Sequence, residues 1–259
     1  MRAIVVTDRA GGTAGVTLME CPEPNAAIND VLVQVHASGF VSTELTWPST
    51  WTDRVGRERK PVIPGHELAG VVTALGYGTT GLSVGQRVLG LTDWYRDGTL
   101  AEYVAVEARN LAPLPGDVDF TIGASLPISG LTAWQGLFEH GRLRAGQSVL
   151  VHGAAGAVGS MVTQLAREFG AYVIGTGRAA DRQKVRDFGA QEFVDSRRTS
   201  SRMLAQSIWY STWSGVKSGG ALRASYEREE HWCPSLGQSR RGRRMVMRST
   251  SLSRPTVGS

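Results

Sequence analysis

The feature that most constrains the fold of this chain is a glycine-rich turn at residues 149–160, with the sequence VLVHGAAGAVGS. The apolar run VLV before the turn is typical of a buried strand, and apolar residues recur at helical spacing after it. Strand, turn and helix follow one another without a linker, which is how a dinucleotide-binding βαβ unit begins.

Within this turn, Ala154, Gly156 and Gly159 match the spacing G-x-G-x-x-G with alanine at the first position. Gly156 lets the backbone approach a pyrophosphate, Gly159 lets the helix pack closely on the strand, and the helix N-terminus offers N–H groups to phosphates. A tight turn between a buried strand and a helix is the alternative. The predicted cofactor-binding residues of the turn are Gly153, Ala154, Ala155, Gly156, Ala157, Val158 and Gly159.

A second apolar strand, residues 171–175, is followed by Thr176, Gly177 and Arg178. NAD-binding units place an Asp or Glu about 20 residues after the glycines to hold the ribose 2′-hydroxyl. No acid occupies that position here, whereas the hydroxyl of Thr176 and the guanidinium of Arg178 suit the 2′-phosphate of NADP. We therefore predict NADP(H) as the cofactor, with a solvated surface arginine as the alternative for Arg178.

Length and composition exclude several classes of protein. The chain has 259 residues, which is enough for two domains. No apolar run is long enough to span a membrane, the N-terminus lacks a signal-peptide profile, and two cysteines make no disulfide framework. We expect a cytoplasmic protein that has no membrane partner.

The net charge of +5 hides two different parts of the chain. Residues 1–195 hold 16 of the 28 Lys and Arg and 20 of the 23 Asp and Glu, a balance of −4. Residues 196–259 have a balance of +9, are rich in Ser and Arg, and keep no helical or alternating period. This basic tail is predicted to be irregular and disordered.

The remaining elements are predicted from apolar patterns and turn residues. Short strands in the first part indicate a small barrel, and residues 120–138 have a more helical pattern. Asp181 is expected to cap a short helix that ends at Gly189, before a third strand. The predicted strands are residues 3–6, 31–35, 68–72, 86–89, 171–175 and 190–195.

Six segments together resemble one family in order and spacing. They are ASGFVSTEL (37–45), IPGHELAGVV (63–72), VGQRVLG (84–90), DGTLAEYV (97–104), LPISGLTAWQGL (126–137) and VLVHGAAGAVG (149–159). In these segments the chain resembles the medium-chain dehydrogenase/reductase superfamily, in its zinc-independent, quinone-oxidoreductase-like branch.

The resemblance implies an α/β plus β fold in three parts. Residues 1–115 would form a GroES-like β-barrel domain, residues 116–195 the N-terminal half of a Rossmann domain with its doubly wound parallel sheet, and residues 196–259 an aberrant tail. The resemblance also implies NADPH in the cleft between the domains, hydride transfer to a quinone or enone-type acceptor, and a homodimer.

Zinc-dependent relatives carry cysteines where this chain has Val41 and the segment Ile128-Ser-Gly130. Valine and isoleucine cannot bind zinc, although His66 and Glu67 remain. We therefore expect no metal.

The sequence offers two candidate catalytic residues and does not decide between their catalytic and structural roles. Thr43 and Thr132 match family positions near the reacting centre, and their alternative roles are a loop hydrogen bond for Thr43 and helix packing for Thr132.

The tail lacks the strands with which the family continues. Codons for residues 207–215, 228–239 and 244–255 can be chosen so that one shifted frame encodes DLVFDVVG, GGTLVSVAGPV and DGDAVDFVVEA, in family order. Tryptophan and methionine codons have no synonymous freedom, so three long matches in one frame are hard to attribute to chance. We hypothesise a frameshift close to Ser196.

Two functions therefore remain open. The first is an NADPH-dependent oxidoreductase. The second is a non-enzymatic remnant of one with weak or no activity, because losing the last strands exposes an edge of the parallel sheet. Nucleic-acid binding by the tail through Trp209, Trp213 and Trp232 is not expected, because a basic run alone is a permissive signal.

Overall fold

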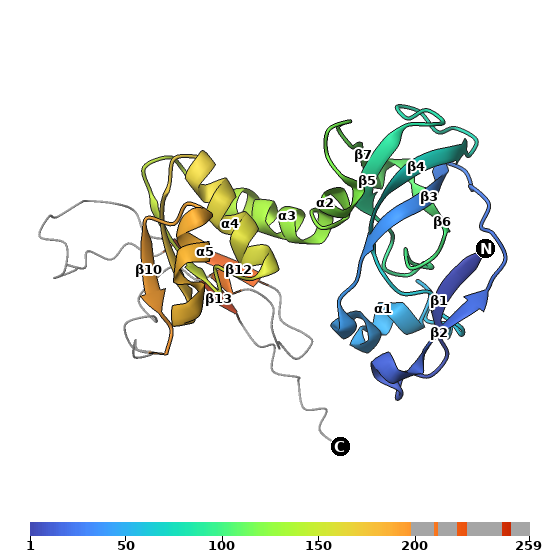
Figure 1. The fold of residues 1–259 in the computed structure, drawn as a ribbon, viewed down its shortest axis with the longest axis horizontal. Coiled ribbons are helices and arrows are strands. Elements are labelled where there is room, and N and C mark those ends of the chain that lie inside the picture. The colour runs from blue at the N-terminus through green and yellow to red at the C-terminus, as the bar shows by residue number, and fades with distance from the viewer. Residues whose placement is uncertain (198–209, 212–221, 227–244, 250–259) are drawn as a thin grey trace, which may run out of the picture. The chain divides into compact units, whose positions relative to one another are not determined.

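The computed structural model describes residues 1–197, 210–211, 222–226 and 245–249, and the chain forms two compact units (Figure 1). The first unit is Met1–Ile128 and the second is Ser129–Ser259. The first unit includes α2 (Phe120–Ala124) and the first two residues of α3 (Pro127–Trp134).

The first unit is built on short strands, as predicted, and they pair antiparallel. One sheet has two strands, β1 and β2, and the other has five in the order β6-β3-β4-β5-β7. The strands are β1 (Arg2–Val6), β2 (Val16–Glu20), β3 (Asp30–Gly39), β4 (Glu67–Leu75), β5 (Arg87–Leu91), β6 (Tyr103–Glu107) and β7 (Leu111–Pro113). The helical segments are η1 (Gly12–Gly15), η2 (Ser42–Thr46), α1 (Pro48–Trp51), η3 (Ala108–Asn110), α2 (Phe120–Ala124) and the start of α3 (Pro127–Trp134).

The predicted closed barrel is wrong, because these two sheets do not join into one ladder. β1 meets the rest of the unit through single-residue bridges from Ala3 to Ala101 and from Val6 to Val62. Isolated bridges leave the sheets open, so the first unit is a GroES-like arrangement of open sheets. Its main core consists of valines and a leucine that face inward at every second strand position: Val31, Val33, Leu68, Val72, Val88, Val104 and Val106.

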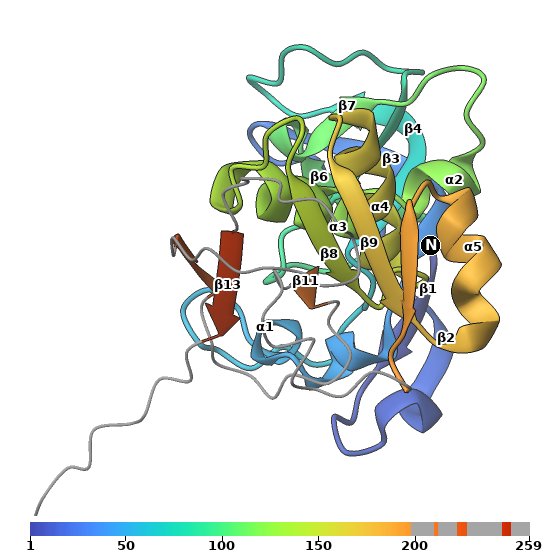
Figure 2. The same cartoon turned by 90° about the vertical axis from the view of Figure 1, so that its left-hand side faces the viewer.

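The second unit contains a parallel sheet with the order β10-β9-β8-β11 (Figure 2). The strands are β8 (Ser148–His152), β9 (Tyr172–Gly177), β10 (Glu192–Asp195) and β11 (Tyr210–Ser211). The other elements are η4 (Gln135–His140), α4 (Ala157–Glu168), η5 (Ala179–Asp181) and α5 (Arg182–Asp187). This order is the 3-2-1-4 start of a doubly wound sheet, whose topological switch point lies between β8 and β11.

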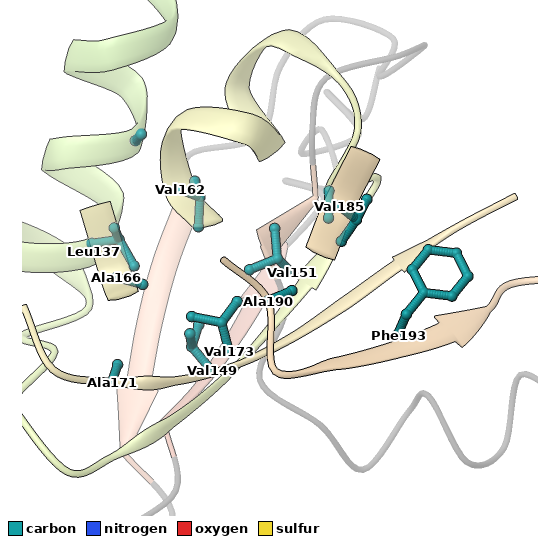
Figure 3. Packing of buried hydrophobic residues seen from close by; sticks show 12 residues of the cluster. Leu137, Val149, Val151, Val162, Ala166, Ala171, Val173, Val185, Ala190 and Phe193 are labelled. Atoms are coloured by element: carbon teal, nitrogen blue, oxygen red, sulfur yellow. The ribbon is translucent and has the colours of Figure 1, made fainter. Parts of the chain in front are cut away.

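In the second unit, residues of α3, η4, α4 and α5 pack with the three long strands into one core (Figure 3). Gly175 of β9 lies against Val185 of α5 and Ala154 of the glycine turn, since an added Cβ would lie 2.4 Å and 3.0 Å from their side chains. The cluster is Ala133, Leu137, Val149, Val151, Ala154, Val162, Ala166, Ala171, Val173, Val185, Ala190 and Phe193.

The tail is not wholly irregular, which corrects the prediction for residues 196–259. β12 (Leu222–Tyr226) and β13 (Met245–Ser249) pair antiparallel, and β11 pairs in parallel with Val151 and His152 of β8. The edge of β8 that was expected to be open is thus paired at two residues. Trp209, Trp213 and Trp232 lie outside the described residues.

In the part of the chain that the structure describes, we find no helix that is both long and apolar enough to cross a membrane.

Leu68 tests the core of the first unit. Its side chain is fully buried, with 0% exposure, whereas Leu18 on β2 is 64% exposed. Leu68→Ala should lower the free energy of unfolding by about 3 kcal/mol, because it removes buried methyl groups and leaves a cavity. Urea denaturation followed by circular dichroism measures this. Leu18→Ala is the matched control and should change stability by less than about 0.5 kcal/mol, and equal losses in the two variants would contradict the assigned core.

Candidate cofactor site

The glycine-rich turn connects the end of β8 directly to the start of α4. No loop residue lies between the two elements outside the glycine motif. Gly153 adopts a positive φ of 62°, a conformation that glycine adopts at little cost, and its carbonyl accepts the N–H of Gly156 at 2.9 Å. Gly156 is the N-cap of α4 and has no side chain to cover the first turn of the helix. The turn therefore exposes backbone where a phosphate can approach.

Gly159 brings α4 against the turn itself. A Cβ at this position would lie 2.2 Å from the carbonyl oxygen of Gly153 and 2.9 Å from Cα of Ala154. No side chain fits in this space, so the close approach of helix and strand depends on glycine here.

The predicted residues of the turn differ in how far they are exposed to solvent. Gly156 and Ala157 are exposed at the start of α4, whereas Ala154 and Gly159 are buried between the helix and the sheet. The exposed residues are those that can contact a ligand, and the buried ones hold the helix in place. Gly153, Ala155 and Val158 are half-buried between these two groups.

The turn lies at the carboxyl end of β8, beside β11, which is the switch point of the sheet. In open α/β sheets ligands bind in the crevice outside the carboxyl ends of the strands at this point. The end of β9 lies next to it, because the N–H of Ala154 donates to the carbonyl of Thr176 at 2.9 Å. The structure thus brings the predicted pyrophosphate and 2′-phosphate residues to one edge.

Thr176 is buried, and its hydroxyl is engaged inside the sheet. Its Oγ1 lies 3.1 Å from Nδ1 of His152, the last residue of β8. Burial lowers the pKa of His152, which favours the neutral imidazole. The hydroxyl that the sequence assigns to a cofactor therefore also joins β9 to β8, a contact that the sequence analysis missed although His152 directly precedes the turn.

Arg178 extends into solvent, with a side chain that is 71% exposed. Its Nε donates to Oδ2 of Asp181 at 3.2 Å. Asp181 was expected to cap α5, but its side chain makes no capping hydrogen bond and binds the arginine instead. Only the i,i+3 spacing of the two residues signals this pair in the sequence.

In the first unit, Thr43 is an exposed residue of η2, next to the fully buried carboxylate of Glu44. Glu44 Oε2 lies 3.0 Å from Nδ1 of His66 and accepts the N–H of Gly65 at 3.1 Å. Its Oε1 accepts the N–H of Val41. These bonds hold the segment that carries Thr43 against the start of β4.

Thr132, the other predicted catalytic residue, is an exposed residue of α3 in the second unit.

Glu67 follows His66 and binds the start of α3. Its Oε2 accepts the N–H of Ile128 at 2.9 Å, and burial raises the pKa of this carboxyl despite that bond. A Cβ on Gly39 would lie 2.1 Å from Oε1 of Glu67, so a glycine leaves room for the carboxylate. Among the described residues, no group of three or more His, Cys, Asp or Glu is arranged to hold a metal.

A surface pocket of about 870 Å³ lies in the first unit. Its three arginines are paired with acids within the pocket, Arg96 with Asp30, Arg54 with Asp93 and Arg109 with Glu107. Its charges are thus largely satisfied by one another, and none of the predicted site residues lines it.

Comparison with known proteins identifies the family. Residues 27–116 match the alcohol dehydrogenase GroES-like domain. Quinone oxidoreductase of Rattus norvegicus is 34% identical over 213 residues, which is 78% of this chain and 63% of the relative. A polyketide synthase system protein of Streptomyces orinoci, NorB, is 37% identical over 190 residues, 72% of this chain and 8% of that much longer protein.

Comparison with solved structures points to the same family. The quinone oxidoreductase of Coxiella burnetii superposes with a TM-score of 0.71 at 25% identity, covering 80% of this chain and 66% of that one. A mycobacterial protein complexed with NADPH has a TM-score of 0.65 at 32% identity, covering 75% of this chain and 58% of that one. The chain belongs to the medium-chain dehydrogenase/reductase superfamily and is quinone-oxidoreductase-like. It spans about 60% of the length of the quinone oxidoreductases that it matches.

Gly159→Ala tests the close approach of α4 to the turn. The new methyl group must displace the backbone of Gly153, so we expect a loss of about 1–3 kcal/mol in stability, as for other overpacked sites, together with weaker binding of NADPH. Thermal denaturation and titration of cofactor fluorescence measure the two effects. Gly130→Ala is the control, because a Cβ on this helical glycine of α3 meets no atom within 4 Å. Unchanged stability and binding in Gly159→Ala would contradict the packing described above.

The lowered pKa of His152 predicts that the folded protein loses stability in acid. Because its pKa in the folded protein lies below the ordinary value of 6.5, its contribution is complete above pH 6.5 and is lost as the pH falls below it. Urea denaturation at pH 7 and pH 5 should therefore show a smaller acid-induced loss in His152→Gln than in the unmodified chain. His140→Gln, at an exposed position of η4, is the control. Equal acid-induced losses in all three proteins would refute the assignment.

Proposed function

We propose that residues 1–195 are the NADPH-binding and hydride-transferring part of an oxidoreductase that reduces a quinone or enone-type acceptor without zinc. The observation that carries this proposal is the glycine turn at the switch point, where α4 begins at the exposed Gly156 and Ala157 and its N-cap makes no side-chain hydrogen bond with the described residues. The similarity to quinone oxidoreductases supports the acceptor class.

The residues of the turn fit a dinucleotide. A Cβ added at Gly156 would lie 3.3 Å from the carbonyl oxygen of Gly153. Gly156 is also exposed, so a ligand can approach its backbone from solvent. The N–H groups at the start of α4 and the positive end of its dipole would bind the pyrophosphate. Arg178, beside this turn at the end of β9, would bind the 2′-phosphate of NADPH as a charge-assisted, planar donor. Thr176 would support this subsite from β9.

When bound, the cofactor supplies the hydride, and the chain must orient the acceptor and polarise its oxygen. Thr43 and Thr132 are the candidates, because both hydroxyls are on exposed residues and a hydroxyl can donate a hydrogen bond to a developing negative charge. The buried bonds of Glu44 would keep Thr43 in place. Val41 and Ile128 offer no ligand atoms, which supports chemistry without zinc.

The alternative that we retain is a truncated or frameshifted remnant of this enzyme. It is supported by the sheet, in which the fourth strand, β11, comprises two residues. It is also supported by the shifted-frame peptide DLVFDVVG, which corresponds to residues 207–215 and therefore spans β11. A complete fourth strand would cover the remaining edge of β8 and extend the wall of the cofactor crevice.

We further propose a cytoplasmic protein that acts on a small molecule. Its low cysteine content supports a reducing compartment, and Cys21 is a free thiol. The homodimer implied by the family remains a prediction.

Both functions are tested by comparing two purified proteins in NADPH oxidation with a quinone. One is the mass-verified 259-residue chain, and the other is the product of a gene with the frame restored near codon 196. We expect weak or absent turnover by the first protein and turnover at about 1 s⁻¹ or faster, within the ordinary range of enzymes, by the second.

The outcomes separate the proposals. Rapid turnover by the 259-residue chain would refute the remnant. Failure of both proteins to bind NADPH would refute the oxidoreductase. The nucleotide sequence itself checks the frameshift, which fails if the shifted frame does not encode the three peptides.

A further inference from the structure

We propose that Asp181 is a specificity-determining residue that competes with the 2′-phosphate of NADPH for Arg178 and thereby narrows the preference between NADPH and NADH. The inference rests on the proposed cofactor site at the ends of β8 and β9. The sequence pattern assigns Asp181 only a helix cap, which its side chain does not form, and the proposed function gives this carboxylate no role.

The guanidinium and the carboxylate are held together by one short turn. The N–H of Asp181 donates to the carbonyl of Arg178 at 2.8 Å, which closes η5. Within that turn, Nε of Arg178 lies 3.2 Å from Oδ2 of Asp181. Because backbone and side chains bond between the same two residues, the pair forms with little loss of chain entropy.

The side chains of Arg178 and Asp181 differ in their exposure to solvent. The Arg178 side chain is 71% exposed, whereas that of Asp181 is 23% exposed. Cβ of Asp181 lies 3.7 Å from the position of a Cβ on Gly177, the last residue of β9, and the ring of Phe193 lies 3.4 Å from it. The carboxylate is therefore anchored beside the strand end, and the arginine is the partner that can move.

Other charges nearby do not replace this pair. The guanidinium of Arg182 lies over the ring of Phe193, with Cζ 4.8 Å from the ring centroid. Asp187 is bonded to Gln183 along α5 at 2.8 Å. Among the described residues, Asp181 is the acid that is ion-paired with Arg178.

This arrangement affects the two cofactors in opposite ways. A 2′-phosphate must draw Arg178 from Asp181 or share it, and the fixed carboxylate repels the phosphate dianion at short range. The ribose of NADH carries a hydroxyl at the same place, and Asp181 in η5, four residues after the end of β9, offers a carboxylate that can accept a hydrogen bond from it. Asp181 thus weakens NADPH binding and supports NADH binding.

The test measures the dissociation constants of NADPH and NADH for the full chain by nicotinamide fluorescence, with 2′,5′-ADP as a competitor that carries the phosphate alone. Asp181→Asn should tighten NADPH and 2′,5′-ADP about fivefold at low salt, because it removes both the competing partner and the repulsion. NADH should bind equally or less tightly. Arg178→Gln should weaken NADPH about tenfold or more, since a charge-assisted bond to phosphate is lost, and should leave NADH unweakened.

Asp187→Asn is the matched control, because it removes one negative charge from the same region without touching Arg178. Unchanged NADPH affinity in this variant, with tightening in Asp181→Asn, supports the proposal.

NADPH affinity that is unchanged or weakened in Asp181→Asn overturns the inference while leaving the cofactor site intact. Equal tightening in both Asn variants overturns it as well, because general charge would then explain the effect. An unmodified chain that binds neither cofactor refutes the inference, and the proposed function is refuted with it only when the frame-restored protein also fails to bind NADPH. Circular dichroism of each variant checks that the substitutions leave the fold unchanged.

Discussion

The contact on which the rest of the second unit depends is the packing of the first turn of α4 on the backbone of Gly153 and Ala154. This contact is possible because Gly159 has no side chain, since a single Cβ would overlap the Gly153 carbonyl. The position of α4 determines where its N-terminal N–H groups lie relative to the ends of the strands. The same turn is joined to β9 through the bond from Ala154 to Thr176. One close approach therefore positions both halves of the proposed cofactor site.

Polar side chains around the turn, and in the first unit, form contacts that join neighbouring backbone segments. Thr176 and His152 join two strands inside the sheet, and Arg178 and Asp181 form a pair at its edge. In the first unit, Glu44 is buried, yet it accepts two backbone N–H groups and lies beside His66. A buried carboxylate is costly unless it is bonded in this way. Polar interactions thus hold the backbone segments that carry the candidate site residues.

Local patterns predicted the elements of residues 1–195 well. The alternating valines that predict β3 and β4 form the core of the first unit, and the helical spacing after the glycine turn corresponds to α4. Closure of the barrel was predicted wrongly, because it depends on pairing between β1 and distant strands rather than on any local pattern. Asp181 is the N-cap residue of α5, as predicted, but its side chain makes no capping hydrogen bond, since an arginine three residues earlier offers the carboxylate a charged partner.

The sequence by itself determined the strand–turn–helix unit, because glycine spacing and apolar periodicity are local and bear directly on backbone conformation. It also identified the family and the residues of the candidate site. Only the tertiary structure decided which of those residues are available to a ligand. Gly156, Ala157 and Arg178 are exposed, whereas Ala154, Gly159 and Thr176 are buried in contacts between elements. Burial and pairing depend on neighbours that are distant in the chain, and no local pattern specifies them.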